Sequence, residues 1–215
     1  SGLIYSGIYN SNSGINNLNQ FIQAEKITKD INPTYGSIQK LFSRNTDLIS
    51  LCEDRVVRIQ ANKDAIFNAD GNPQIIASNN VLGQTMPFSG DYGISKNPES
   101  FTSDNYRAYF TDKSRSAVLR LSKDGLTPIS EYGMSDWFKD NLRNYPKLVG
   151  SFDNVKEDYN LTLREANTTT GYTPTTLTYN ENVKGWTSFK SFIPEQALSM
   201  NNEYYSFNGG YIYKH

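Results

Sequence analysis

From residue 47 onward the chain alternates short apolar segments with polar turns, a pattern typical of antiparallel β-sheets. Four of these segments predict the strands of a first unit, about residues 47–78. The predicted strands are residues 47–52, 55–60, 65–67 and 74–77. Glu53-Asp54 forms a two-residue hairpin candidate, and Asp70-Gly71 lies in the second loop, where glycine accepts the positive φ of a tight turn.

Two further units repeat this arrangement after a polar loop rich in Gly and Pro. The second unit covers about residues 100–130, and Asp124-Gly125 in its last turn aligns with Asp70-Gly71. The third covers about residues 147–192. The predicted strands are residues 100–102, 106–111, 117–121 and 126–129, then 147–152, 157–164, 175–179 and 186–192.

The last aromatic segments, within about residues 204–214, begin a fourth unit that stays partial. Radially repeated four-stranded sheets are the blades of β-propellers. We therefore predict a mainly β, propeller-like fold of repeated four-stranded antiparallel sheets, with a β-sandwich or stacked sheets as the alternative. Known propellers close with about 4–8 blades. We expect the missing blades to come from another chain or from sequence beyond one or both ends.

Two segments depart from the strand pattern. Residues 1–46 are interpreted as an N-terminal arm with a short helix, because Leu18, Phe21 and Ile22 follow a weak helical spacing. The alternative is a packed first element of the propeller-like domain at residues 47–215. A second short helix is predicted near residues 135–142, with Ser135 as its N-cap and with inward-facing side chains. These inward residues are Trp137, Phe138 and Leu142.

Composition and charge narrow the possible functions. Hydrophobic residues make up 37% of the 215 positions and aromatics 13%, which favours sheets over disorder. The net charge is −1 and the basic residues are scattered, so no broad positive field for nucleic acid is expected. Cys52 is the only cysteine, which excludes an intrachain disulfide and a cysteine-based zinc site. His215 is the only histidine, so a histidine-dependent triad has no credible base.

The sequence contains no targeting or membrane-spanning segment. No apolar run approaches the roughly 18 residues of a membrane helix, and no signal peptide is recognisable. The chain begins with Ser1-Gly2 and not with Met, which is consistent with a cut end.

Carboxylates are the only candidate catalytic groups. Four of them surround the second unit, and two that converged would suit glycoside hydrolysis. They are Asp91, Glu99, Asp104 and Asp112. Most aspartates of this chain stand beside Gly or Asn in turns, where they bond backbone amides, so the structural role is favoured. We therefore assign no catalytic, cofactor-binding or metal-binding residue, and expect no enzyme and no cofactor.

Three other motifs are interpreted in structural terms. The segment 68–72 around Asp70-Gly71 lacks the ligand spacing of a calcium loop and is explained by a hairpin turn. Asn160 and Asn167 match the glycosylation pattern by chance in a chain rich in Asn and Thr. Bulky aromatics are expected to fill the core between adjacent sheets, although exposed aromatics could also stack on sugars or bases. They are Trp137, Trp186 and Phe189.

Four segments resemble virion proteins of short-tailed bacteriophages. They are residues 109–112 (Tyr-Phe-Thr-Asp), 117–130, 133–138 and 179–189, the last of which reads Tyr-Asn-Glu-Asn-Val-Lys-Gly-Trp-Thr-Ser-Phe. The resemblance extends from about residue 45 to the end and is closest to the muzzle, or stabilization, protein of crAss-like phages. That protein occupies the place of the tail nozzle (tail tubular protein B) of other podoviruses.

The resemblance implies a structural protein of the phage tail, in a ring around the DNA exit channel. The implied partners are other copies or fragments of the same protein, neighbouring tail and portal ring proteins, and DNA that passes without tight binding. Family members are much longer than this chain, and no catalytic residue is carried over. The alternative function is a carbohydrate-binding or carbohydrate-cleaving β-propeller, such as an adhesin or depolymerase. A pocket with two convergent carboxylates beside an exposed aromatic would favour that alternative.

Overall fold

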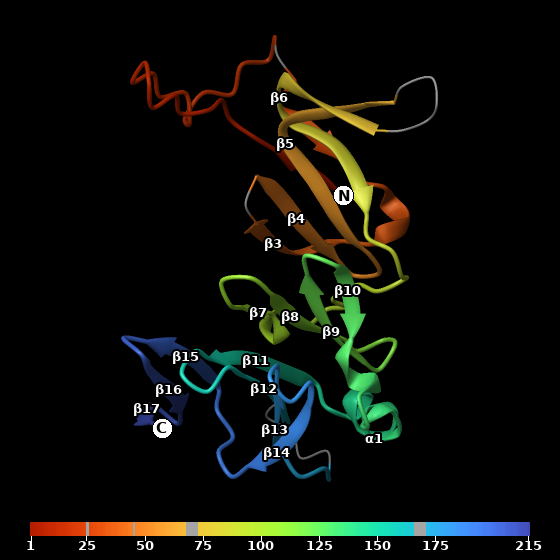
Figure 1. Ribbon diagram of the computed structural model, residues 1–215, viewed down its shortest axis with the longest axis vertical. Helices are drawn as coiled ribbons and strands as arrows, with labels where there is room; N and C mark the ends of the chain where they lie inside the picture. Colours follow the sequence, from red (N-terminus) through yellow and green to blue (C-terminus); the bar gives the residue numbers. More distant parts are fainter. Residues whose placement is uncertain (25, 45, 68–72, 166–170) are drawn as a thin grey trace. The chain divides into compact units, whose positions relative to one another are not determined.

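The computed structural model describes residues 1–24, 26–44, 46–67, 73–165 and 171–215. The chain forms two compact units, Ser1–Phe88 and Ser89–His215, which are described one after the other. Strands dominate both units, and every strand pair is antiparallel (Figure 1).

A four-stranded sheet in the order β3-β4-β5-β6 forms the centre of the first unit. Its strands are β3 (Ile38–Arg44), β4 (Asp47–Cys52), β5 (Val56–Phe67) and β6 (Pro73–Pro87). The hairpin at Glu53-Asp54 is confirmed, because the Cys52 amide donates to the Arg55 carbonyl at 2.9 Å. The turn predicted at Asp70-Gly71 lies outside the described residues, while Phe67 and Pro73 on either side of it are paired.

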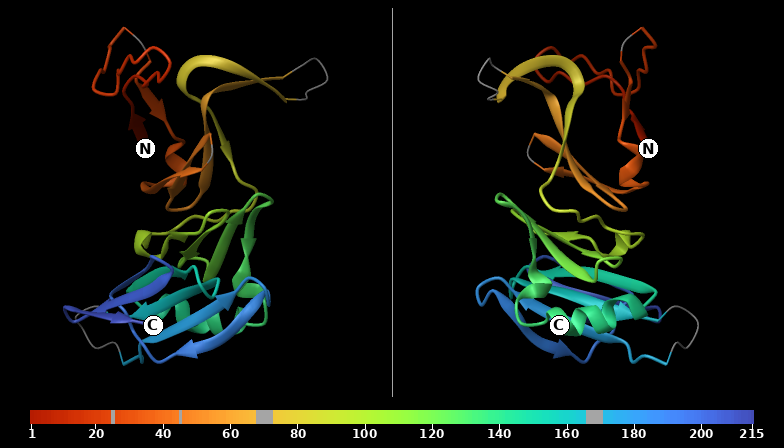
Figure 2. Two further views of the ribbon diagram at one scale, coloured as in Figure 1. Left: turned by 60° about the vertical axis from the view of Figure 1, so that its left-hand side comes forward. Right: turned by 90° about the vertical axis from the view of Figure 1, so that its right-hand side faces the viewer.

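The strand limits in this sheet differ from those predicted. The segments 55–60 and 65–67 belong to one strand, β5, and segment 74–77 extends to residue 87 as β6. The prediction ends one strand at residue 60 and begins the next at residue 65, but β5 continues through residues 61–64, and shifts of register after Ile59 and Ala61 accompany its pairing with β6. Figure 2 shows how this long pair bends along its length. The fourth strand is β3, which lies within the predicted arm 1–46 and pairs with β4.

The helix expected in the arm is absent from the described residues. A short strand, β1 (Gly2–Ile4), pairs with β2 (Thr28–Asp30), and a 3₁₀ turn, η1 (Pro33–Tyr35), follows. Between β1 and β2 the described segment consists of turns and irregular chain. The Asn10 side chain accepts the amides of Asn12 and Ser13 there. Asparagine side chains that bond nearby amides compete with helix formation, which overrides the weak apolar spacing.

Apolar residues from β2 to β6 form the core of the first unit. Its buried members are Ile31, Cys52, Val57, Ile59 and Leu82. Partly buried side chains from the N-terminal segment, including Leu3 and Tyr5, pack against them. The N-terminal segment is therefore attached to this core near its two ends.

The described residues of the second unit form three sheets, which follow one another in chain order. The first has the order β10-β9-β8-β7, the second β11-β12-β13-β14 and the third β15-β16-β17. The first two sheets are four-stranded and antiparallel, as predicted, but the strand predicted at residues 100–102 is displaced to Thr102–Ser103 because Ser100 belongs to a 3₁₀ turn. Their strands are β7 (Thr102–Ser103), β8 (Ala108–Asp112), β9 (Ala117–Ser122), β10 (Gly125–Pro128), β11 (Lys147–Asp153), β12 (Asp158–Arg164), β13 (Thr175–Asn180) and β14 (Gly185–Lys190).

The third sheet has one strand more than the sequence pattern predicted. Its strands β16 (Glu203–Asn208) and β17 (Tyr211–Lys214) were expected, whereas β15 (Gln196–Met200) was not. The strand β15 contains only three apolar residues and a proline precedes it by two positions, so its pattern is weak. It becomes a strand by pairing along its whole length with β16.

The short helix predicted near residues 135–142 is confirmed as α1 (Ser135–Asn141). Three 3₁₀ turns, η2 (Pro98–Ser100), η3 (Ile129–Glu131) and η4 (Leu142–Asn144), complete the unit. The cap expected at Ser135 is wrong: Met134 precedes the helix, Ser135 is its first residue, and no side chain caps the first turn. Phe138 and Leu142 are buried as expected.

A single aromatic-rich core joins the first two sheets of the second unit. Tyr109 of β8 stacks on Tyr159 of β12, with ring centroids 4.7 Å apart. On β11, Gly150 lies so close to η2 that a Cβ atom there would be 2.0 Å from the Ser100 carbonyl oxygen. Glycine is thus required for this approach, and its position fixes where η2 packs on β11.

The fold class is mainly β, with several four-stranded antiparallel sheets and one short α-helix among the described residues. No strand pairing joins one sheet to the next in these residues, so a closed arrangement is not found. The propeller, the sandwich and the stacked-sheet arrangements therefore all stay predictions. Within the same ranges, no helix has the length and apolar character needed to cross a membrane.

Candidate functional site

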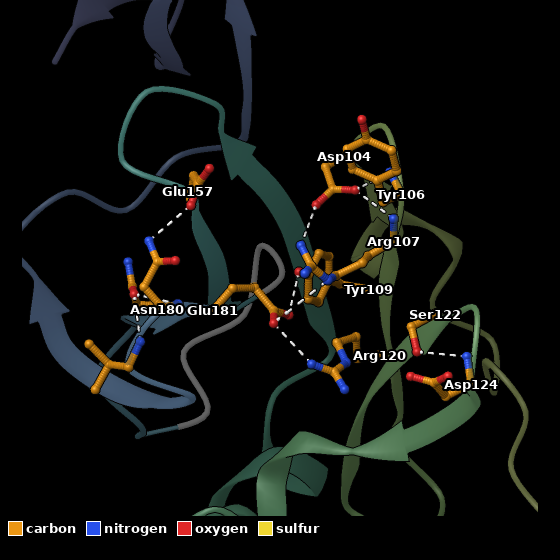
Figure 3. Close-up of polar contacts among 12 residues, drawn as sticks. Asp104, Tyr106, Arg107, Tyr109, Arg120, Ser122, Asp124, Glu157, Asn180 and Glu181 are labelled. Carbon is orange, nitrogen blue, oxygen red and sulfur yellow. Dashed lines mark hydrogen bonds and ion pairs between the residues drawn. The ribbon is translucent and has the colours of Figure 1, made fainter.

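A polar cluster of the second unit centres on Glu181, which follows β13 in the turn to β14. The Asn180 side chain accepts the amides of Asn182 and Val183 and so shapes this turn. The turn directs the Glu181 carboxylate at the neighbouring sheet, β7 to β10 (Figure 3). Glu181 therefore connects two sheets whose residues are far apart in sequence.

Both oxygens of Glu181 are occupied by groups from that neighbouring sheet. Oε1 accepts the Tyr109 hydroxyl at 2.6 Å, and Oε2 accepts Arg120 Nη1 at 2.9 Å. The Arg107 guanidinium lies 3.7 Å from Oε2 and 3.6 Å from a carboxylate oxygen of Asp104. Burial, together with the hydrogen bond to Glu181, raises the pKa of the Tyr109 hydroxyl.

The Glu181 cluster is arranged to hold two sheets together. Its acids and bases neutralise one another, and the buried Tyr109 hydroxyl donates a hydrogen bond to a carboxylate that already pairs with Arg120. Hydrogen bonds to charged groups are shorter and stronger than neutral ones. Across the parts of the chain that the structure describes, no group of three acidic, histidine or cysteine side chains could hold a metal ion.

The four carboxylates singled out in the sequence serve different purposes. Asp112 is fully buried at the end of β8 and accepts the Gly93 amide at 3.0 Å and the Ser95 hydroxyl at 2.9 Å. The Arg115 guanidinium also bonds it, at 2.9 Å. Asp112 therefore ties the preceding loop to its own turn, as expected for a structural aspartate.

The other three carboxylates lie in turns or on the surface. Asp104 accepts the amides of Tyr106 and Arg107 and so shapes the turn between β7 and β8. Asp91 and Glu99 are exposed. Asp104 thus bonds amides of its own turn, and Asp112 bonds both its own turn and the loop before β7, which is the structural role favoured from the sequence.

The large aromatics fill the core as predicted, with one exception. Trp137 and Trp186 are partly buried against the core, and the Trp186 indole donates to the Ile129 carbonyl at 3.0 Å. Phe189 touches Trp137 at a centroid distance of 5.9 Å but stays 60% exposed, so its assignment to the core is wrong. Its strand, β14, is the last of its sheet, which explains the exposure.

The two glycosylation patterns have different outcomes. Asn160 is buried on β12 and its side-chain oxygen accepts the Thr178 hydroxyl at 2.6 Å, so the folded sheet leaves no room for a glycan there. Asn167 lies outside the described residues, as does the segment 68–72 that was weighed as a calcium loop.

A cavity of about 320 Å³ lies at the sheet β15 to β17, which is called the C-terminal sheet. None of the residues that line it is acidic, so it differs from the carboxylate-bearing pocket expected of a glycoside hydrolase. They are Ser191, Phe192, Ile193, Pro194, Ser206, Asn208, Tyr213 and His215. Burial lowers the pKa of the His215 imidazole, and the positive charge of Lys156 lowers it further while Asp153 opposes the change.

The sheet containing this cavity is attached to β11 by hydroxyl groups. The Ser151 and Tyr204 hydroxyls are 2.7 Å apart, and the Ser199 hydroxyl donates to the Phe152 carbonyl at 2.9 Å. These hydrogen bonds hold the C-terminal sheet against β11.

Residues 4–210 match the family described as the Crassvirus muzzle protein. The chain belongs to this family. A comparison with curated proteins found no match. The match covers nearly the whole sequence and confirms the resemblance to the muzzle protein of crAss-like phages. Members of the family are structural proteins of the phage virion, so the chain is a virion-associated structural protein.

The sequence pattern did not reveal Glu181, Arg107 and Arg120 as a cluster. Glu181 is separated from Tyr109 by 72 positions and stands in an ordinary polar turn. Only the packing of one sheet against the next brings these side chains together. The nearest signal is the segment 179–189, which contains Glu181 and was quoted for the phage resemblance.

Proposed function

We propose that the chain is a non-enzymatic part of the phage tail, in the nozzle-like muzzle, where copies or fragments of the same protein assemble around the DNA exit channel. The observation that carries this proposal is the family match over residues 4–210. The interior of the second unit supports it, because its buried carboxylates have structural roles: Glu181 links two sheets, and Asp112 ties a loop to its own turn. Glu181 and Asp112 are both engaged with the protein's own groups.

DNA passes such a channel without tight binding. A net charge of −1 supports this, because a channel lined by many cations would hold phosphates and slow their transit. An electrophoretic shift assay with double-stranded DNA at physiological salt tests this part. We expect no retarded band at micromolar protein, and a stable complex would contradict free passage.

The position in the tail is tested by immunogold electron microscopy of purified virions with antibodies raised against this chain. We expect gold particles at the tail, and none on the capsid. Gold on the capsid or on side fibres, with none at the tail, would overturn the proposal. Tailless capsids from the same preparation serve as the control, because they should stay unlabelled.

The carbohydrate-cleaving alternative makes the opposite prediction for catalysis. It would require two convergent carboxylates in a cavity, and the cavity at the C-terminal sheet has none in its lining. Release of reducing sugar from host capsular polysaccharide by the purified chain would favour that alternative over the structural proposal.

A further inference from the structure

Three short segments of the second unit come together around the turn between β8 and β9. They are residues 93–97, 112–116 and 143–147. The Ser95 hydroxyl accepts the Ser114 amide at 3.0 Å, and Arg143 Nη2 donates to the Ser114 carbonyl at 2.5 Å. The Lys113 ammonium donates to the Tyr145 carbonyl at 2.6 Å. Residues that are far apart in the sequence therefore lie side by side here.

These segments carry an excess of positive charge. They contain five cations and one acid, whereas the rest of the second unit contains nine cations and 14 acids. We call the five cations the basic patch: Lys96, Lys113, Arg115, Arg143 and Lys147. The acid is Asp112, which is fully buried and accepts hydrogen bonds from Arg115 and from backbone amides. Cations that are scattered in the sequence thus gather in the fold.

Three cations of the patch lack the carboxylate partner that is usual in this unit. In its described part, at least eight cations lie within 4.0 Å of a carboxylate oxygen. The described residues provide no such partner for Lys113, Arg143 or Lys147, and the first two bond backbone carbonyls instead. Burial lowers the pKa of the Lys113 ammonium. An anion that approached this surface would therefore meet uncompensated positive charge.

The chemistry of the patch indicates which anion it fits. None of the exposed large apolar side chains of the described residues belongs to the three segments, and Tyr145 is buried. Protein interfaces are built around apolar and aromatic side chains, and single-stranded nucleic acid binds by stacking on aromatic rings. The phosphates of a double helix need only cations and hydrogen-bond donors. The patch therefore matches a duplex backbone better than it matches either of the other two partners.

We propose that the basic patch contacts the phosphate groups of double-stranded DNA as the DNA passes the protein. The inference rests on the proposed function, which makes DNA in transit the polyanion that this chain meets. Arg143 and Lys147 are exposed and make the contact. A guanidinium has five N–H donors, so Arg143 can bond a phosphate and still hold the Ser114 carbonyl. Lys113 and Arg115 add to the positive field beside them.

The contact is weak and independent of base sequence. Asp91 and Glu99 stand close to Lys96 in the sequence and reduce its contribution, so we expect about three neutralised phosphates. Each neutralised phosphate contributes about −0.9 to the slope of the logarithm of the binding constant against the logarithm of the salt concentration. So few contacts leave a dissociation constant above about 10⁻⁴ M at physiological salt, which agrees with passage without tight binding.

Fluorescence anisotropy of a labelled duplex of about 20 base pairs, titrated with the full chain, tests the proposal. At about 20 mM salt we expect a dissociation constant of tens of micromolar or less, with a salt slope of about −3. The double variant Arg143→Gln/Lys147→Gln should bind at least about tenfold more weakly, and its slope should be smaller in magnitude by about 2.

A matched control separates the patch from net charge. Lys123→Gln/Lys184→Gln removes the same charge from two exposed lysines outside the patch, and should stay within about twofold of the parent chain. Arg143→Lys keeps the charge and should retain most of the binding. All variants should melt at the temperature of the parent in circular dichroism, because only exposed side chains are changed.

Three outcomes would overturn the proposal. One is a parent chain that does not bind the duplex at about 20 mM salt. Another is an equal loss of binding in the two double variants, because net charge alone would then explain it. The third is stronger binding to poly-glutamate, or to vesicles containing phosphatidylserine, than to a duplex of matched charge. That result would assign the patch to an acidic protein or to a membrane surface.

These outcomes are distinct from failure of the proposed function. Gold labelling at the tail combined with no duplex binding would remove the DNA contact and leave the tail assignment intact. Gold labelling elsewhere combined with salt-dependent binding through Arg143 and Lys147 would do the reverse.

Discussion

Replacing Glu181 by alanine tests whether the Glu181 cluster holds the two sheets of the second unit together. The substitution removes the acceptor of the Tyr109 hydroxyl and the partner of Arg120, and leaves both groups in the interior. The Glu181 and Arg120 side chains are 7% and 17% exposed, so water replaces the lost contacts poorly. We therefore expect a large loss of folding free energy.

The magnitude follows from the two contacts. Breaking a buried ion pair by removing one partner costs roughly 3–5 kcal/mol, and a stranded hydrogen-bonding group costs about 1–3 kcal/mol. The two costs share one carboxylate and do not add, and Arg120 retains some contact with water. The expected loss for Glu181→Ala is about 3–4 kcal/mol. Glu181→Gln keeps an acceptor for Tyr109 and should lose about 1–2 kcal/mol.

Urea unfolding followed by tryptophan fluorescence measures this loss. Both tryptophans of the chain, Trp137 and Trp186, pack against the core of the second unit and so report its unfolding. Glu131→Ala, which changes an exposed glutamate in the same unit, should stay within about 0.5 kcal/mol of the parent. A double-mutant cycle of Glu181→Ala with Tyr109→Phe should show a coupling of about 1 kcal/mol, because each single change removes the hydrogen bond between the two side chains.

A loss below about 1 kcal/mol for Glu181→Ala would refute the reasoning. It would mean that the Glu181 cluster contributes little to folding stability and that the aromatic core alone joins the two sheets. An unchanged urea midpoint with a smaller dependence of the unfolding free energy on urea concentration would instead indicate that less surface is exposed on unfolding.

Three further predictions follow from individual residues. Gly150→Ala should destabilise the second unit by at least about 3 kcal/mol or prevent folding, because its Cβ would lie 2.0 Å from the Ser100 carbonyl oxygen. The control Gly185→Ala should cost under about 1 kcal/mol. Equal effects of the two variants in urea unfolding would contradict the close approach. The His215 imidazole should titrate below pH 6.5 in proton NMR, because burial lowers its pKa. The contribution of the neutral imidazole to folding stability should therefore be complete above pH 6.5 and decrease as the pH falls through the lower folded pKa. A titration midpoint at or above 6.5 would be inconsistent with the burial of this side chain. The Cys52 thiol is buried, and burial raises its pKa. An aromatic disulfide reagent should therefore label it at least about a hundredfold more slowly in the native chain than in urea. Comparable labelling rates would contradict the assignment of Cys52 to the core.

The local pattern of the sequence predicted most strands of the second unit. Runs such as residues 117–121 and 157–164 are bounded by turns with strong chemistry, as at Asp124-Gly125, and their side chains became the core. Prediction failed where the apolar pattern is weak or interrupted. The pattern breaks between residues 60 and 65, but β5 continues through this segment with irregular register. The weak apolar spacing at Leu18 to Ile22 was overridden by asparagine side chains that bond nearby amides.

The sequence pattern did not predict contacts between residues that are far apart in the chain. Nothing near Glu181 indicates that it meets Tyr109, and nothing near Gly150 indicates that Ser100 packs on it. Such contacts depend on how one sheet packs against the next, which the period of apolar residues does not encode. The conclusion that no carboxylate pair was credible as a catalytic site came from turn chemistry, which is local. That reasoning agrees with the contacts of Asp104 and Asp112, which accept the amides of Tyr106 and Arg115 in their own turns.

A symmetric reconstruction of the intact virion tail by electron cryomicroscopy tests the central claim most directly. At a resolution that separates strands, the sheets β7 to β10 and β11 to β14, joined at Tyr109 and Glu181, should fit density repeated around the DNA exit channel. Density for these sheets in the capsid or in side fibres, with none around the channel, would contradict the proposed role in the tail.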